Sequence, residues 1–336
     1  MAGLTAEQIE QFEAEGYLVA EGVLDPETIL DPVIEEYSEV LDSLIHDLYQ
    51  REEISSLFEG LDFAERFIKV CIETGDVHKQ YFDFSLPFQN VKPDTPFWAG
   101  QAVLNAFTAE SLLDCIESLI GPEIYSNPVQ HVRIKPPEAI LPKNQFGNPI
   151  LGQTNWHQDQ GVVVEEADET KMLTVWFAFQ DVAIEQGPLK VVPRSHRDGL
   201  LTHCTNYHGN GPATVGGRQI PEKLFEADRT IPVPVKRGDV IFLTRRTVHG
   251  SLPNVSDTIR WSFDLRYNPI GQHTGRVAFP GFVARSRKHP EQELRDAKVW
   301  TQNWLNTREK MSKINQGGQI EVQFGRWKEG HPDCEV

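Results

Sequence analysis

The stretch 236-KRGDVIFLTRRTVHGSLPNVSDTIRWSFDLRY-267 contains a turn, a buried strand and a return strand in one continuous run. Gly238 and Asp239 mark the turn, and the apolar residues 240–243 are typical of a buried strand. Residues 259–267 are rich in β-branched and aromatic side chains, which favour strands. The run therefore predicts two neighbouring strands of one sheet.

Four upstream segments have the same character, because each is rich in β-branched and aromatic residues and bounded by Gly, Pro or Asp. They are residues 123–137, 171–182, 187–193 and 229–235. Short strands at this spacing are typical of an antiparallel sandwich or barrel. We therefore expect a mainly β core over residues 123–270.

The segments on both sides of this core are predicted to be helical. The N-terminal segment, residues 1–122, is mainly helical in this prediction. Within it, Thr5-Ala-Glu-Gln8 has the form of a capping box, and Gly16 is placed to end that helix. A short strand is expected next, and Asp25-Pro26 begins a long helix that reaches about Tyr49.

Further helices are predicted over residues 108–119 and 290–314, the second followed by a polar tail. Residues 203–221 hold four glycines and two prolines without periodicity, so we expect a loop there. The chain contains no internal repeat, and residues 1–336 are predicted to form a single domain.

The net charge of −17 and the pI near 5.1 describe a surface that repels phosphate backbones and anionic lipids. Nucleic-acid and membrane partners are therefore not expected. The four cysteines are widely spaced and include no C-x-x-C pair, which predicts reduced thiols. The N-terminus has no basic or apolar leader, so we expect a cytoplasmic protein.

The chain contains three His-x-Asp pairs, a spacing that is weak evidence by itself because the chain holds eleven histidines. The pairs are His157/Asp159, His196/Asp198 and His331/Asp333. Arginines flank the second pair and disfavour a cation there, and the third lies in the polar tail. In the first pair, alternate residues of an extended segment face the same way, so both side chains could reach one metal.

His249 is the candidate third ligand for this metal, and Arg260 follows it by eleven residues on the strand predicted beside it. Two histidines and a carboxylate on one face of an octahedral metal are the arrangement of non-haem iron(II) oxygenases. A 2-oxo acid can fill two of the open positions, and its far carboxylate then needs a buried cation. A guanidinium suits that carboxylate because its planar fork pairs with both oxygens.

The order of the motifs resembles the phytanoyl-CoA dioxygenase family of iron(II)/2-oxoglutarate-dependent oxygenases. The blocks that carry the resemblance are LTAEQIEQFEAEGYLVAEGVL (4–24), RIKPP (133–137), NWHQDQG (155–161), TVWFAFQDVAIEQGPLKVVPRSH (174–196) and residues 236–267. The resemblance implies a double-stranded β-helix, or jelly roll, with flanking helices. It also implies iron(II), 2-oxoglutarate as cosubstrate and O2.

By this resemblance, His157, Asp159 and His249 match the iron ligands, and Arg260 matches the residue that binds the far carboxylate of 2-oxoglutarate. The resemblance also implies a place in the cosubstrate pocket for Ser251, Trp176, His131 and Lys135. Each of these four residues has a structural alternative, as a turn serine, a core aromatic, a hydrogen-bonded strand histidine and a lysine that reaches water. Arg194 departs from the family, which often has glycine before Ser-His.

The expected reaction is hydroxylation of a small organic molecule, with release of succinate and CO2. Asp159 argues against halogenation, because related halogenases lack a carboxylate at that position. Desaturation, epoxidation and cyclisation remain open, as do a zinc hydrolase and a non-catalytic binding protein. The acidic composition disfavours a CoA thioester as substrate. Residues that could shape the substrate pocket are Phe88, Phe97, Trp98, Trp156 and the loop 203–221.

Overall fold

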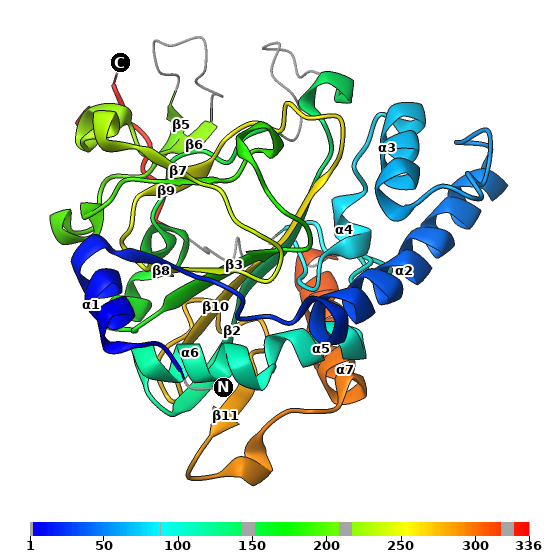
Figure 1. The fold of residues 1–336 in the computed structure, drawn as a ribbon. Helices are drawn as coiled ribbons and strands as arrows, with labels where there is room; N and C mark the ends of the chain where they lie inside the picture. Colours follow the sequence, from blue (N-terminus) through cyan, green and yellow to red (C-terminus); the bar gives the residue numbers. More distant parts are fainter. Residues whose placement is uncertain (1–2, 88, 143–151, 208–216, 317–325, 336) are drawn as a thin grey trace.

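A computed structural model describes residues 3–87, 89–142, 152–207, 217–316 and 326–335. Antiparallel sheets form the centre of the molecule (Figure 1). The large six-stranded sheet has the order β1 (Tyr17–Ala20), β8 (Val240–Thr244), β3 (Leu173–Ala178), β10 (Arg260–Pro269), β2 (Glu123–Lys135) and β11 (Phe282–Ser286). The small three-stranded sheet has the order β7 (Ile231–Val233), β4 (Leu189–Val191) and β9 (His249–Ser251).

All the strands predicted between residues 123 and 270 are present, and four strands were not predicted, among them β9 of the small sheet. β11 extends the large sheet, and β5 (Cys204–Tyr207) pairs with β6 (Gly217–Gln219) in a separate two-stranded sheet. The prediction that residues 203–221 are a loop without strands is therefore wrong at both ends of that segment. β5 was not predicted because it is supported by the distant segment that contains Lys328, through an isolated bridge between Cys204 and Lys328.

The helical caps predicted near the N-terminus are confirmed. In α1 (Ala6–Glu15), Thr5 and Gln8 form the capping box, and Gly16 ends the helix with a φ of 82°. Asp25 caps a π-helical turn, Pro26–Leu30, that leads into α2 (Asp31–Gln50).

Helices also flank the sheets elsewhere in the chain. They are α3 (Phe63–Thr74), α4 (Lys79–Phe82), α5 (Gln101–Phe107), α6 (Glu110–Ile120) and α7 (Ala297–Gln316). α6 and α7 were predicted, although α7 begins later than expected because Pro290–Gln292 forms only a 3-10 turn. Among the residues that the structure describes, no helix is both long and apolar enough to cross a membrane.

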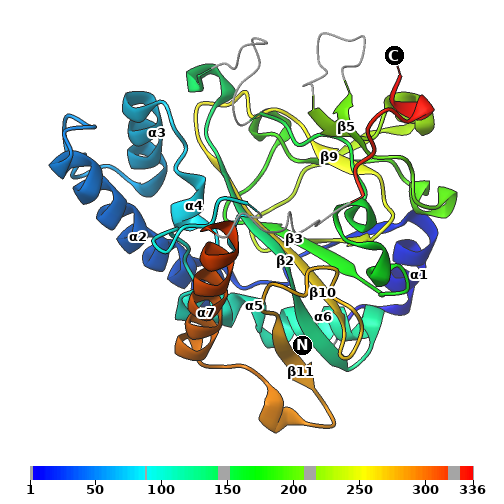
Figure 2. The same cartoon turned by 180° about the vertical axis from the view of Figure 1, so that it is seen from behind.

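The large sheet has one apolar face and one polar face, because side chains alternate along each strand. On β10, Trp261, Phe263, Leu265 and Tyr267 join the core that packs against the helices. Figures 1 and 2 show the helices α5, α6 and α7 on one side of this sheet and the small sheet on the other.

The opposite face of β10 carries Arg260, Ser262, Asp264 and Arg266. The strand register places Lys135, Arg133 and His131 of β2 opposite the first three of these residues, and Trp176 of β3 opposite Asp264. The polar face is thus rich in arginine, and it is turned toward the small sheet.

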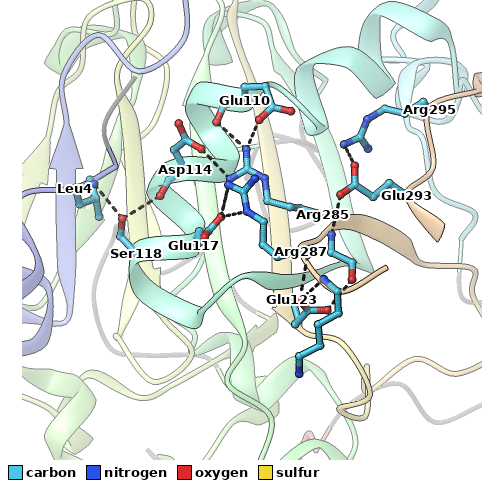
Figure 3. A network of polar contacts seen from close by, with 12 residues as sticks. Leu4, Glu110, Asp114, Glu117, Ser118, Glu123, Arg285, Arg287, Glu293 and Arg295 are labelled. Carbon is cyan, nitrogen blue, oxygen red and sulfur yellow. Dashed lines mark hydrogen bonds and ion pairs between the residues drawn. The ribbon is translucent and has the colours of Figure 1, made fainter. Parts of the chain in front are cut away.

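Arg285 ties the edge strand β11 to α6 (Figure 3). Its guanidinium is 2% exposed and pairs with three carboxylates of that helix, at 2.5 Å, 2.8 Å and 2.9 Å. These carboxylates belong to Glu110, Asp114 and Glu117. A buried guanidinium needs such partners, because an uncompensated charge is costly away from water.

A disulfide joins Cys204 to Cys334, so the expectation that all four cysteines are reduced thiols is wrong for this pair. Cys71 and Cys115 are free and buried, and burial raises the pKa of their thiols to about 12 and about 11, respectively. The bond was not predicted because its cysteines lie 130 residues apart in the sequence. Disulfides are rare in the reducing cytosol, so this bond does not support the cytoplasmic location, which stays a prediction.

The disulfide predicts a count of reactive thiols. The denatured protein should react with two equivalents of an alkylating agent without reductant and with four after reduction, as measured by mass spectrometry. Cys334→Ser should lower the free energy of unfolding by about 2–4 kcal/mol in denaturant titrations, because the bond restricts the unfolded chain. Reductant should then have no further effect on the variant. Four reactive thiols in the untreated protein would contradict the assignment.

Candidate active site

His157 and His249 are held side by side by the backbone. His157 lies in an irregular segment that pairs with β9, and each residue's N–H donates to the other's carbonyl, at 2.9 Å and 3.0 Å. Gly250 allows this approach, because a Cβ there would lie 2.6 Å from the carbonyl oxygen of Thr154. The two imidazole rings have centroids 4.1 Å apart.

Backbone carbonyls fix the orientation of both rings. Nδ1 of His157 donates to the carbonyl oxygen of Asn155, and Nδ1 of His249 donates to that of Thr247, each at 2.9 Å. A carbonyl can only accept, so Nδ1 carries a proton in both rings and Nε2 is the atom left for a metal. Burial, together with His249, lowers the pKa of His157 to about 3, so this ring is neutral near pH 7.

Asp159 completes the group, and its carboxylate is fully buried. Its oxygens lie 3.7 Å from Nε2 of His157 and 4.0 Å from Nε2 of His249. Nη2 of Arg266 donates to Oδ1 at 2.6 Å, and the hydroxyl of Thr174 donates to Oδ2. Burial opposes ionisation, but the hydrogen-bonded guanidinium of Arg266 outweighs it and holds the pKa of Asp159 well below its usual range.

These three residues are the one cluster of possible metal ligands among the described segments of the chain, with ligand atoms within 4.8 Å of one another. Two imidazoles and one carboxylate with open positions suit iron(II). Within the described part of the chain, the other His-x-Asp pairs form no such cluster. Nε2 of His196 contacts the carbonyl oxygen of Glu13, and His331 lies on the surface as expected.

The two glutamines of NWHQDQG hold the ligand loop in place. The side-chain amide of Gln158 donates to the carbonyl oxygens of Gly199 and Arg246, and that of Gln160 donates to Asp168. Gln158 lies between the two loop ligands, and its backbone N–H donates to Nε2 of His203 at 3.0 Å.

Gly161 ends the ligand loop against the same histidine. A Cβ at this position would lie 2.2 Å from Cε1 and Nε2 of His203. Only glycine therefore fits between the loop and the ring, which explains the final residue of the motif.

A cavity of about 820 Å3 opens beside the three ligands. Its wall includes residues of both large and small sheets, among them Trp176 and Arg266 on one side and Leu189 and His249 on the other. The two sheets therefore face each other across the cavity, with the possible metal ligands in its wall.

Arg260 lies in the cavity wall with 1% of its surface exposed. Nη1 donates to Ser262, and the guanidinium lies 5.6 Å from the ring centroid of Trp176. Among the described residues, its Nε has no hydrogen-bond partner and its charge has no ion pair, in contrast to the equally buried Arg285 with its three carboxylates. The site thus presents a buried cation for which the described residues provide no anion.

The other predicted cosubstrate residues occupy two different places. Trp176 and His131 line the cavity, and Nδ1 of His131 lies 3.1 Å from Asp83. Ser251 and Lys135 are not among the residues of the cavity wall. Nζ of Lys135 donates to Ser251 at 2.9 Å and to Thr154 at 3.1 Å, so this pair supports the segment that precedes the ligand loop. Direct contact of Ser251 and Lys135 with a cosubstrate stays a prediction.

The aromatic residues expected to shape the pocket lie elsewhere. Trp156 packs on Phe225 and beneath Lys190, because it alternates with His157 and faces away from the cavity. Phe97 packs near Trp304 in the helical core, and Trp98 donates to Glu36. Phe88 lies outside the described residues.

The loop 203–221 does reach the cavity, through Thr205 and Arg218. Several other residues of the wall were missed, namely Arg133, Asp264, Arg266, Arg276 and Trp327. Arg266 and Asp264 could have been found, because they alternate with apolar residues on the same strand as Arg260. Trp327 could not, because the polar tail carries no pattern that places it beside the cavity.

Comparison with known proteins identifies this arrangement. The model of the family described as phytanoyl-CoA dioxygenase (PhyH) matches residues 12–262, which contain all three possible metal ligands and Arg260. The chain belongs to this family. It is a 2-oxoglutarate-dependent non-haem iron oxygenase by class, with His157, Asp159 and His249 as the facial triad.

Relatives are similar over most of their length. Phytanoyl-CoA dioxygenase domain-containing protein 1 of Danio rerio is 27% identical over 271 residues, covering 76% of this chain and 87% of the relative. The protein of that name from Rattus norvegicus is 22% identical over 296 residues, covering 84% of this chain and 94% of the relative. A solved structure described as a non-heme monooxygenase, ThoJ in its apo form, has a TM-score of 0.53 at 15% identity. The match covers 93% of this chain and all of ThoJ, and it shows a similar fold.

The contact between Gly161 and His203 predicts the effect of one added methyl group. Gly161→Ala should displace the ligand loop, weaken Mn(II) binding at least about tenfold in calorimetric titrations, and destabilise the protein by about 1–3 kcal/mol. In Gly161→Ala/His203→Ala the clash is absent, so the loss should be smaller than the sum of the two single losses. Additive losses would show that the ring does not set the position of the loop.

Proposed function

We propose that the chain is an iron(II)- and 2-oxoglutarate-dependent dioxygenase that hydroxylates a small organic molecule. The observation that carries this proposal is the buried Arg260, a cation without an ion pair among the described residues, in the same cavity as a complete facial triad. A metal alone would explain the triad. A cosubstrate with a second carboxylate explains Arg260 as well.

The residues of the site fit the metal. His157, His249 and Asp159 would hold iron(II), since backbone carbonyls engage both Nδ1 atoms, both Nε2 atoms face the carboxylate, and that carboxylate is ionised. Arg266 and Thr174 hold the carboxylate in one orientation, as outer partners of metal ligands do. The protein thereby supplies a rigid ligand set before any metal binds.

The residues near Arg260 fit the far carboxylate of 2-oxoglutarate. The guanidinium presents its fork inside the cavity, where low solvent access strengthens a charge-assisted pair. Trp176 covers one side of this position, with its ring 5.6 Å from the guanidinium. A zinc hydrolase or a simple metal-binding protein would leave this buried guanidinium without a role.

Iron(II) with 2-oxoglutarate and O2 supplies the oxidising power, giving succinate, CO2 and an oxidised substrate. The protein's side chains would bind the metal and the far carboxylate of the cosubstrate, exclude water and place the substrate carbon to be oxidised. Hydroxylation is the outcome that we propose, and desaturation, epoxidation or cyclisation in the same cavity would differ in substrate placement.

We further propose that the two facing sheets form the double-stranded β-helix of these oxygenases. The antiparallel pairings, the position of the ligands between the sheets and the similarity to ThoJ support this interpretation. A small molecule in the cavity is the partner that we propose, and a cytoplasmic location is retained as a proposal.

The cosubstrate complex should be visible by spectroscopy. Anaerobic addition of iron(II) and 2-oxoglutarate should produce a visible charge-transfer band, because the 2-oxo acid binds the metal through its carboxylate and keto oxygens. Asp159→Ala should lose the band, since one of three ligands is missing. Absence of the band in the wild-type protein would refute the proposed function.

Arg260→Ala should weaken 2-oxoglutarate binding by about 30-fold or more, because it removes one partner of a buried charge pair. Titration of the charge-transfer band gives the affinity, and calorimetry with Mn(II) should show metal binding within about threefold of wild type. Arg260→Lys keeps the charge without the planar fork, so its 2-oxoglutarate affinity should lie between those of wild type and Arg260→Ala. An unchanged cosubstrate affinity in Arg260→Ala would remove this residue from the proposal.

A further inference from the structure

We infer that the substrate carries an oxyanion, a carboxylate or a phosphate, which Arg133 binds while 2-oxoglutarate occupies Arg260. This inference rests on the proposed function and names the substrate class for the same cavity. It follows from the balance of charge in the cavity wall, from the position of Arg133, and from the number of anionic groups that the cosubstrate offers.

The cavity wall is strongly cationic, although the chain as a whole carries a net charge of −17. Among the described residues, this wall contains the five arginines Arg133, Arg218, Arg260, Arg266 and Arg276 and the two carboxylates Asp159 and Asp264. Arg266 pairs with both carboxylates, at 2.6 Å and 2.9 Å. Both of these carboxylates are therefore already paired with a single arginine of the wall, Arg266.

Of these arginines, Arg133 makes the fewest side-chain interactions with the described residues. Arg218 lies over the ring of Trp327, Arg260 donates to Ser262, and Arg276 donates to the carbonyl oxygen of Val162. Arg133 has no hydrogen bond or ion pair with any residue in the described ranges. It is only half-buried, so its free donors face the cavity and its solvent.

Arg133 also lies close to the cosubstrate position without coinciding with it. On the large sheet it is the register partner of Ser262, while Arg260 pairs with Lys135. Burial, with the charge of Arg133, lowers the pKa of Arg260 to about 9. Burial and the charge of Arg266 lower the pKa of Arg276 to about 9 as well, so positive charges crowd this wall.

The cosubstrate alone does not neutralise this wall. One carboxylate of 2-oxoglutarate is assigned to the metal, and both oxygens of the other match the fork of Arg260. The cavity of about 820 Å3 is at the upper end of the range for drug-sized ligands, which is about 300–1,000 Å3. It therefore has room for a second molecule whose anionic group would pair with Arg133.

Calorimetry with simple anions tests this inference without turnover. Wild-type protein saturated with Mn(II) and 2-oxoglutarate is titrated with butyrate, with inorganic phosphate and with the neutral analogue butyramide. We expect saturable binding of at least one anion and none of butyramide. The anion that binds more tightly distinguishes a carboxylate substrate from a phosphate substrate.

Arg133→Gln should weaken binding of that anion at least about tenfold, while the affinity for 2-oxoglutarate stays within about threefold of wild type, because a charge-assisted pair is lost only at the anion site. Arg133→Lys, which keeps the charge, should lose less anion affinity than Arg133→Gln. Thermal stability of Arg133→Gln should equal or exceed that of wild type, because the variant removes a charge next to other arginines, so misfolding is not expected to mask the result.

Two results would overturn the inference. One is the absence of anion binding to the wild-type complex. The other is an equal loss of anion and 2-oxoglutarate affinity in Arg133→Gln, which would make Arg133 a cosubstrate residue. If 2-oxoglutarate itself fails to bind wild type with Mn(II), the proposed function fails, whereas the dependence of anion binding on Arg133 still decides the anion site.

Discussion

The contact between Asp159 and Arg266 is the interaction on which the site depends. A carboxylate with no exposed surface is stable as an anion only when a cation compensates for its lost hydration, and Arg266 provides that charge from β10. The pair also joins the ligand loop to the large sheet. Because Arg260 lies on the same face of the same strand, one strand sets both the orientation of a metal ligand and the position of the proposed cosubstrate anchor.

The buried arginines of this protein fall into two groups that serve different purposes. Arg285 is surrounded by carboxylates of α6 and fastens the edge strand to a helix, as Figure 3 shows. Arg260 is buried to a similar extent and, among the described residues, has only a serine hydroxyl and an aromatic face. The first residue stabilises the fold, while the second leaves a charge unpaired at the place where a ligand can compensate for it. Both guanidinium groups are buried, so burial alone does not distinguish a structural arginine from a ligand-binding one. The distinction comes from whether carboxylates of the described chain pair with the buried charge.

Local patterns explain why much of the fold could be predicted from the sequence. The capping box at Thr5, the stop at Gly16 and the helix start at Asp25 depend on neighbouring residues only, and all three are present. The triad was found because spacing and order select one of three His-x-Asp pairs. Trp156 was misplaced because the alternation that joins His157 to Asp159 was not applied to the residue between Asn155 and His157. Arg266 was missed for a similar reason, although the alternation of β10 contains it.

Other features depend on contacts between residues far apart in the sequence, which no local pattern predicts. β5 is supported by the C-terminal segment, Trp327 reaches the cavity through the same segment, and the disulfide joins residues 130 positions apart. Short helices such as α4 and α5 form because the core packs around them. Their own sequences carry too few periodic positions to predict them.

The disulfide has a consequence for how the enzyme can be handled. Cys204 follows His203, whose ring accepts from the backbone of Gln158 between two of the metal ligands. Lys328 and Cys334 hold the other side of that segment, so a short series of contacts connects a reducible bond to the ligand loop. A thiol reductant added to keep iron ferrous would act on this bond as well. An assay buffer that contains a thiol reductant therefore changes two things at once, the oxidation state of the metal and the contacts that hold the ligand loop in place.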